Sequence, residues 1–397
     1  MRGIRIANLY GHFDYNIIFS EEGMTILTGP NGFGKSTILR IIYALANSDL
    51  DYFFELSFSE IEILMDDPAQ NFLMEKEQDY LHIHEHRLRR QDFMEWKKSS
   101  IQQNEADIES FTRSIIITGI SGIVIQMQMV AGHVFLIEEQ RLVKSEIRRS
   151  VNHVNGNRNY EHRIVQAVRG IPEQLQERME QAAGAYSNIS NELDSTFPQR
   201  LFAQKEGISN QDFNTALASM QTKVRKLKEY GISNIGKLDD MQFKENDARA
   251  LKVYFSDFEK KYLQYEKLID YLDLFKDIVN SRFLFKQMQI SAEKGVSIFD
   301  DHGSEIPLSK LSSGEKETLI LFYKLIFEVP ENSMLLIDEP EMSLHIAWQR
   351  KFAEDLKTIV DRKAIKAVIA THSVQIINGN RRIQRDLGQL YEKNGFD

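Results

Sequence analysis

The sequence predicts an α/β protein in which a mixed sheet, with an antiparallel β subdomain, carries an inserted helical domain. Apolar strands followed by short polar loops occur near both ends of the chain, at residues 24–28, 334–337 and 367–370. Between these ends, the spacing of apolar residues changes from every second residue to every third or fourth. We therefore expect the two ends to form one core, interrupted by helices.

Composition bounds the class of protein. Of the 397 residues, 42% are hydrophobic and 27% are charged, which is typical of a folded globular chain. No window reaches the roughly 20 apolar residues of a membrane span, and the start MRGIRIANLY lacks a signal-peptide core, so we expect a cytoplasmic protein with no membrane contact. The absence of cysteine excludes disulfides and thiolate metal sites. A net charge of -9 favours a protein partner and restricts nucleic-acid contact to local basic patches.

The first segment, residues 1–150, is predicted to be one lobe of the core. Its start shows two strands, a glycine-rich loop and a helix, in the order 4–9, 24–28 and 36–46. Short alternating runs then predict an antiparallel β subdomain with one mobile polar loop. These runs lie at residues 55–65, 80–86 and 123–129, and the polar loop at 96–107.

The second segment, residues 151–282, is predicted to be the helical insertion. Three apolar stripes at helical spacing occupy residues 175–197, 213–227 and 251–279. Pro198 is expected to end the first helix and Gly231 the second. We expect these helices to pack on one another or on the core, because they are too short for a long coiled-coil arm.

The third segment, residues 283–397, is predicted to be the second lobe. Two strands, 285–291 and 296–299, flank a turn. A serine-glycine loop, a helix at 318–327 and the apolar strands 334–337 and 367–370 follow.

The strongest chemical signal is the sequence GPNGFGKST, which follows an apolar strand and opens a helix. It satisfies the pattern GxxxxGK[ST] in the structural context that this pattern requires. Backbone N–H groups of such a loop wrap phosphates, the lysine reaches the β and γ phosphates, and the serine holds Mg²⁺. The residues predicted to bind the nucleotide here are Gly29, Asn31, Gly32, Gly34, Lys35, Ser36 and Thr37.

Two further signals lie at strand ends. The run MLLIDEP places Asp338 and Glu339 at the tip of a buried strand, where Asp338 is predicted to hold magnesium and Glu339 to deprotonate the attacking water. The strand 367–370 leads into Thr371, His372 and Ser373, which places a histidine beside a γ-phosphate.

A fourth signal is LSSGEKE at residues 311–317, a small-residue turn that opens a helix. A helix N-terminus with a free serine hydroxyl binds anions, although the same residues also make an ordinary helix cap. Its position about 25 residues before the acidic strand favours the anion-binding interpretation. The residues predicted to contact nucleotide are Ser312, Ser313, Gly314 and Glu315.

In this order, the four motifs resemble the Walker A, signature, Walker B with D-loop, and switch-histidine motifs of ABC-type ATPases, most of all those of the RecF, SMC and OLD branch. The resemblance covers residues 1–145 and 285–380 and implies an ABC-type ATPase head, a P-loop NTPase, that uses ATP and Mg²⁺. It also implies that Gln140 lies in the Q-loop and senses magnesium and the attacking water. One departure is His345, which stands where transporter ATPases carry a D-loop aspartate.

In this family the signature loop of one protomer covers the nucleotide of another. The resemblance therefore implies a homodimer, or a higher homo-oligomer, in which Ser312 and Gly314 contact the γ-phosphate of ATP bound to the partner. Contacts that ATP makes and ADP lacks let ATP act as a clamp.

The motif details look most like the ATPase subunits of the PARIS and Septu anti-phage systems. This resemblance implies a sensor and scaffold that controls a separate effector, a Toprim-type or HNH-type nuclease, in response to a phage-encoded trigger protein. The chain ends 25 residues after His372, so we expect no intrinsic nuclease. The alternative is a RecF- or SMC-like DNA-repair or chromosome-maintenance ATPase that binds DNA through basic clusters at residues 87–90, 97–98 and 223–228.

Overall fold

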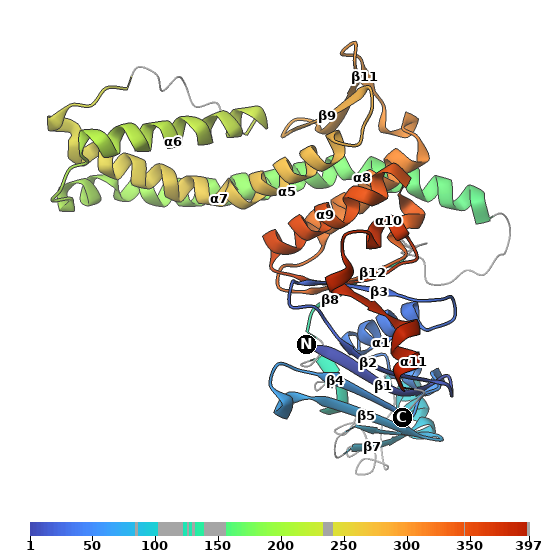
Figure 1. The fold of residues 1–397 in the computed structure, drawn as a ribbon. Helices are drawn as coiled ribbons and strands as arrows, with labels where there is room; N and C mark the ends of the chain where they lie inside the picture. The colour runs from blue at the N-terminus through green and yellow to red at the C-terminus, as the bar shows by residue number, and fades with distance from the viewer. Residues whose placement is uncertain are drawn as a thin grey trace. The chain divides into compact units, whose positions relative to one another are not determined.

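The computed structural model describes residues 1–83, 86–101, 122–124, 127–128, 132–138, 156–232, 241–344 and 346–394. The chain divides into two compact units (Figure 1). The first contains Met1–Leu142 and Glu328–Asp397, and the second is Val143–Phe327. Residues 283–327, which we assigned to the second lobe, therefore belong by their contacts to the unit that contains the helices.

A five-stranded parallel sheet forms the centre of the first unit. Its strand order is β14-β3-β13-β12-β8, and every neighbouring pair runs parallel. Strands β3, β8, β12 and β13 are largely apolar runs, as expected when both faces of a sheet are covered, whereas β14 at one edge has the polar sequence QRD. Their bounds are β3 Met24–Thr28, β8 Val134–Ile137, β12 Met334–Asp338, β13 Lys366–Ala370 and β14 Gln384–Asp386.

The predicted antiparallel subdomain is a six-stranded sheet in the order β2-β1-β4-β5-β6-β7. Along β4 every second side chain is buried, which is why period-2 alternation identified this sheet. The bounds are β1 Gly3–Leu9, β2 Phe13–Ile18, β4 Glu60–Leu64, β5 Phe72–Glu77, β6 Tyr80–Ile83 and β7 His86–Arg89. The fold class predicted from sequence is thus confirmed: an α/β core with a parallel sheet and an antiparallel sheet.

Helix α1, Lys35–Ala46, packs between the two sheets of this unit. Its Ile38, Ile41 and Ile42 share one core with residues from both sheets, among them Ile61 of β4 and Leu336 of β12. This burial fixes the N-terminus of α1 at the end of β3. The other helices of the unit are α2 Leu50–Glu55, α3 Arg90–Ile101, α9 Ile346–Lys363, α10 Val374–Ile377 and α11 Leu387–Asn394.

Two predictions for the antiparallel subdomain were wrong. Within the run 123–129, expected to be a strand, residues 123–124 and 127–128 are helical, and Ile123 and Met127 are buried in the core. The first part of the polar stretch 96–107 belongs to helix α3, while residues 102–107 lie outside the described residues. Helix α3 is anchored by Phe93, whose ring lies 5.6 Å from that of Phe54.

The second unit contains three long helices and a small sheet. The strands β9 Lys286–Ser291, β10 Gly295–Asp300 and β11 Glu305–Ile306 form an antiparallel sheet, which confirms the predicted hairpin. The helices are α5 Gly156–Ala203, α6 Asn210–Glu229, α7 Ala248–Asn280 and α8 Ser313–Tyr323, and α8 continues as a π-helix at Lys324–Glu328. Helix α7 packs against both α5 and α6, as expected from their apolar stripes.

The first of these helices is longer than predicted. Helix α5 has 48 residues and continues through Pro198 to Ala203, so Pro198 does not end it. An interior proline costs about 3 kcal/mol relative to alanine, but contacts with α7 offset that cost. Arg200, one half-turn beyond the proline, donates to both carboxylate oxygens of the buried Asp257, and the rings of Tyr186 and Tyr265 lie 5.3 Å apart.

None of the helices in the described part of the chain is long and apolar enough to cross a membrane.

Candidate functional site

The motif residues of the first unit meet at one edge of the parallel sheet. In its register Asp338 of β12 pairs with Ala370 of β13, and Ala370 pairs with Leu27 of β3. Strand β8 is aligned with them through the pair of Ile137 and Ile337. Because parallel strands end on the same side, the loops that follow these strands converge, and this edge is where open α/β sheets bind ligands.

The phosphate loop, residues 29–37, has the backbone needed to surround an anion. Gly29 and Gly34 have φ angles of 139° and 81°, in regions that side chains rarely adopt. A Cβ atom at Gly34 would lie only 3.1 Å from Leu9 Cδ2. Gly34 caps α1 without any side-chain hydrogen bond, and the first turn of the helix holds no acidic residue. The N-terminal N–H groups of α1 therefore remain available to a phosphate.

Lys35 lies across this loop. Its Nζ donates to the carbonyl oxygens of Gly29 and Pro30, at 3.1 and 3.3 Å, and the residue is only 5% exposed. Burial lowers the pKa of Lys35, and the nearby carboxylates of Glu339 and Asp338 oppose that effect. The ammonium group is thus held where phosphate oxygens would replace two carbonyls as its partners.

Ser36 and Asp338 meet although 302 residues separate them in sequence. Ser36 Oγ donates to Asp338 Oδ1 at 2.9 Å, which joins the start of α1 to the end of β12. Adjacent ligands of an octahedral Mg²⁺ at 2.0–2.1 Å are also about 2.9 Å apart. The separation of the two oxygens therefore fits adjacent ligands of one magnesium ion.

Glu339 and His372 lie side by side at the same edge. Glu339 Oε1 is 3.6 Å from His372 Nε2, and the Glu339 amide donates to the Ala370 carbonyl at 2.9 Å. Glu339 has left-handed φ and ψ angles of 49° and 58°, a strained conformation for a residue with a side chain. Burial raises the pKa of Glu339, with further contributions from Glu341 and Asp338, which strengthens it as a base.

The switch loop, residues 371–373, is held by a residue that sequence reasoning missed. The carboxylate of Glu341 accepts hydrogen bonds from the hydroxyl of Thr371 and the amides of His372 and Ser373. In the sequence, Glu341 is distinguished only by its position two residues after Glu339.

In the second unit, Ser312 caps helix α8. Ser312 and Glu315 form a reciprocal capping box, in which Ser312 Oγ accepts from the Glu315 amide and Glu315 Oε2 accepts from the Ser312 amide. Lys286 of β9 donates to both carboxylate oxygens of Glu315, at 2.7 and 2.9 Å. Burial acts to raise the pKa of Glu315, but the hydrogen bonds from Lys286 and Ser312 outweigh it and the net pKa is lowered.

This arrangement assigns different parts to the predicted signature residues. Ser312 and Ser313 are exposed at the start of α8 and Gly314 is half-buried, so these three are accessible to a ligand. Glu315 is buried, and its carboxylate is bonded to Ser312 and Lys286, so in this structure it supports the loop, and its contact with nucleotide stays a prediction. Lys286 itself gave no sequence signal.

The remaining predicted residues are placed as follows. Asn31 and Gly32 are exposed in the phosphate loop, and Thr37 Oγ1 lies 2.8 Å from the hydroxyl of Tyr10. Gln140 and His345 lie outside the described residues. Just before Gln140, Glu138 forms an ion pair with Arg40 of α1 at 3.5 Å.

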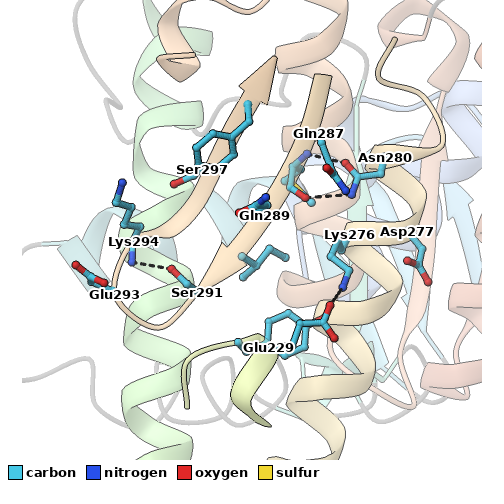
Figure 2. Close-up of a pocket in the computed structure, with 14 residues that line it drawn as sticks. Glu229, Lys276, Asp277, Asn280, Gln287, Gln289, Ser291, Glu293, Lys294 and Ser297 are labelled. Carbon is cyan, nitrogen blue, oxygen red and sulfur yellow. Dashed lines mark hydrogen bonds and ion pairs between the residues drawn. The ribbon is translucent and has the colours of Figure 1, made fainter. Parts of the chain in front are cut away.

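A separate cavity of about 640 Å³ lies in the second unit, between α7 and the β9–β10 hairpin (Figure 2). Several of its polar groups pair with one another. Lys276 pairs with Glu229, and the Asn280 side chain exchanges two hydrogen bonds with the backbone of Met288. None of the motif residues lines this cavity, so we assign it no part in the chemistry of the site.

Three comparisons with known proteins bear on this site. The AAA ATPase domain family matches residues 1–377. Protein ea59 of Escherichia phage lambda is 33% identical over 91 residues, which are 23% of this chain and 17% of that protein. The chain thus spans less than a fifth of the length of this curated relative.

Solved structures with a similar arrangement include two SMC head domains. They are the Smc head of Pyrococcus furiosus, with an extended coiled coil and bound to the C-terminal domain of ScpA, and the SMC head of Thermotoga maritima. Each is 13% identical to this chain with a TM-score of 0.38, and the alignments cover 95% of this chain and 90% and 91% of theirs.

Proposed function

This chain belongs to the AAA ATPase domain family, and we propose that it hydrolyses Mg-ATP in an ABC-type site at the carboxyl edge of the five-stranded sheet. The observation that supports this most directly is the 2.9 Å hydrogen bond between Ser36 and Asp338, which joins two predicted magnesium ligands beside an open phosphate loop. The family membership supports ATPase activity.

Each residue has a distinct part in the proposed mechanism. Lys35 exchanges its two carbonyl partners for oxygens of the β and γ phosphates. Ser36 and Asp338 would hold Mg²⁺, which would supply positive charge to neutralise the phosphates. Glu339 takes a proton from the attacking water, and His372, beside it, orients the γ-phosphate.

Gln140, three residues after β8 in the sequence, is proposed to complete the site as a sensor of magnesium and water. It is the one predicted catalytic residue outside the described part of the chain, and the proposal for it rests on the resemblance of residues 134–142 to a Q-loop.

We further propose that two copies of the chain close each site. The sequence holds one phosphate loop and one signature loop, residues 311–317. Ser312, Ser313 and Gly314 present the N-terminus of the 11-residue helix α8, which attracts anions, and Glu315 beneath them is neutralised by Lys286. A signature loop with this charge balance can approach the γ-phosphate of ATP bound to another protomer.

Two variants test the hydrolytic mechanism. Lys35→Ala removes the phosphate contact, so we expect loss of ATP binding and of hydrolysis. Glu339→Gln keeps the shape of the site but removes the base, so we expect ATP to bind and hydrolysis to stop, with the closed dimer accumulating. Binding of a fluorescent ATP analogue and phosphate release measure the two steps separately. Normal turnover by Glu339→Gln would refute the assignment of the base.

For the biological role, we propose a sensor and scaffold of an anti-phage defence system that controls a separate nuclease subunit. The motif details that resemble PARIS and Septu ATPases support this role, and ATP-driven closure supplies a two-state element that a trigger protein could bias. Co-purification with the product of the neighbouring gene, with ATP, with ADP and without nucleotide, tests it. Absence of a complex in all three conditions counts against this role.

The alternative role is DNA repair or chromosome maintenance with direct DNA binding. Part of the basic cluster on α6 is already paired, since Lys223 binds Glu259 and Lys226 binds Asp273 of α7. These internal ion pairs favour the first role. ATPase stimulation by DNA that weakens as salt increases would favour the second.

A further inference from the structure

Glu341 connects the strand that carries the proposed base to the loop that carries the switch histidine. Its Oε1 accepts from the amides of His372 and Ser373, at 2.7 and 3.0 Å, and its Oε2 accepts from Thr371 Oγ1 at 2.7 Å. Three successive residues of the switch loop thus donate to one carboxylate.

The backbone explains how two nearby glutamates reach the ring and the backbone of one histidine. Glu339 adopts a left-handed conformation and Pro340 follows it at the start of a 3₁₀ turn, Pro340–Ser343. This sharp change of direction places the Glu339 carboxylate 3.6 Å from the His372 ring and the Glu341 carboxylate on the His372 backbone.

The contact is also anchored from helix α9. Gln349 accepts from Ser373 Oγ at 2.7 Å and donates to the carbonyls of Glu341 and Leu344, at 3.2 and 3.1 Å. Thr371, at the other end of the switch loop, is completely buried. Hydrogen bonds to a carboxylate are shorter and stronger than hydrogen bonds to a neutral acceptor. Several such bonds in one network hold the donor groups in place.

We propose that Glu341 is a positioning residue for ATP hydrolysis, which fixes the backbone of the switch loop so that His372 stays aligned with Glu339. Glu341 acts through His372 and does not itself contact ATP. This inference rests on the proposed function, in which Glu339 and His372 act on the γ-phosphate.

Kinetic variants separate this role from a general effect on folding. Glu341→Ala removes both carboxylate oxygens and so all three hydrogen bonds, and we expect kcat to fall about 10- to 100-fold with little change in KM, as expected for loss of alignment. Glu341→Gln retains an amide oxygen for the two backbone donors, so kcat should remain within about 3-fold of the wild type. The double variant Glu341→Ala/His372→Ala should be no slower than His372→Ala alone, because the two residues act as one unit.

Hydrogen exchange provides a readout that does not depend on activity. Without nucleotide, Glu341→Ala should speed exchange of the His372 amide by about 10-fold or more, since its acceptor is lost. Glu354→Ala, which removes an exposed glutamate of α9, is the matched control and should change neither exchange nor kcat.

The outcomes distinguish this inference from the proposed function. Unchanged exchange in Glu341→Ala, or faster exchange with normal kcat, overturns the positioning role while the ATPase mechanism stands. Additive losses in the double variant overturn it as well. If Lys35→Ala and Glu339→Gln hydrolyse ATP normally, the proposed site itself is wrong and the positioning role falls with it.

Discussion

Replacing Lys286 tests the charge balance of the signature loop. In Lys286→Met the methionine fills similar space, but Glu315 loses its ion-pair partner while remaining buried. The side chains of Glu315 and Lys286 are 11% and 26% exposed, between an exposed pair, worth about 0–1 kcal/mol, and a buried pair, whose disruption costs about 3–5 kcal/mol. We therefore expect a loss of about 2 kcal/mol. For a unit of this size that lowers Tm by about 4–8 °C.

The double variant Lys286→Met/Glu315→Gln isolates the electrostatic cause. It removes the unpaired charge yet keeps an oxygen for the Ser312 amide, so differential scanning calorimetry should show most of the lost stability restored. ATP-dependent association should likewise be weakened in Lys286→Met and largely restored in the double variant, because an uncompensated carboxylate beneath Ser312 repels a γ-phosphate. A double variant as unstable as Lys286→Met, or a Lys286→Met chain as stable as wild type, would refute the reasoning.

Three further predictions concern stability. The pKa of Glu315 is lowered in the folded chain, so the ionised carboxylate stabilises the fold fully above the pKa of an unfolded glutamate, about 4.3, and this stabilisation is lost as the pH falls below that value. In urea unfolding, the difference in unfolding free energy between wild type and Glu315→Gln should therefore shrink below about pH 4.3. Gly34→Ala places a side chain at φ 81° and should cost about 1 kcal/mol and abolish ATP-analogue binding, whereas Gly11→Ala, at φ 78° with open space around it, should cost similar stability and keep binding. Pro198→Ala restores a donor for the Asp194 carbonyl within α5 and should stabilise by about 1–2 kcal/mol, seen as a higher Tm; a lower Tm would contradict this.

The sequence predicted the core of the site because its signals are local. A glycine loop, an acid pair and a histidine each directly follow an apolar strand, and parallel pairing brings such strand ends together whatever lies between them. This is why Ser36 and Asp338 were correctly expected at one place although they are 302 positions apart in the sequence.

The contacts that sequence reasoning missed depend on tertiary structure. Lys286 is one lysine on a short strand, and only folding reveals that it neutralises Glu315. Glu341 acquires its partners through the left-handed turn at Glu339, which no local pattern announces. Local propensity disfavours proline inside a helix and therefore predicts that the helix ends at Pro198. Packing of α5 on α7 outweighs that propensity, and the helix continues to Ala203.

The central claim is that one protomer supplies the phosphate loop and another the signature loop. It is tested most directly by mixing two inactive variants, Lys35→Ala, which keeps its signature loop, and Ser312→Arg, which keeps its phosphate loop. In an equal mixture half of the dimers are mixed and each holds one intact site, so phosphate release should recover to about a quarter of the wild-type rate. A mixture that stays as inactive as its components, although each folds and Ser312→Arg binds ATP, would contradict the shared site.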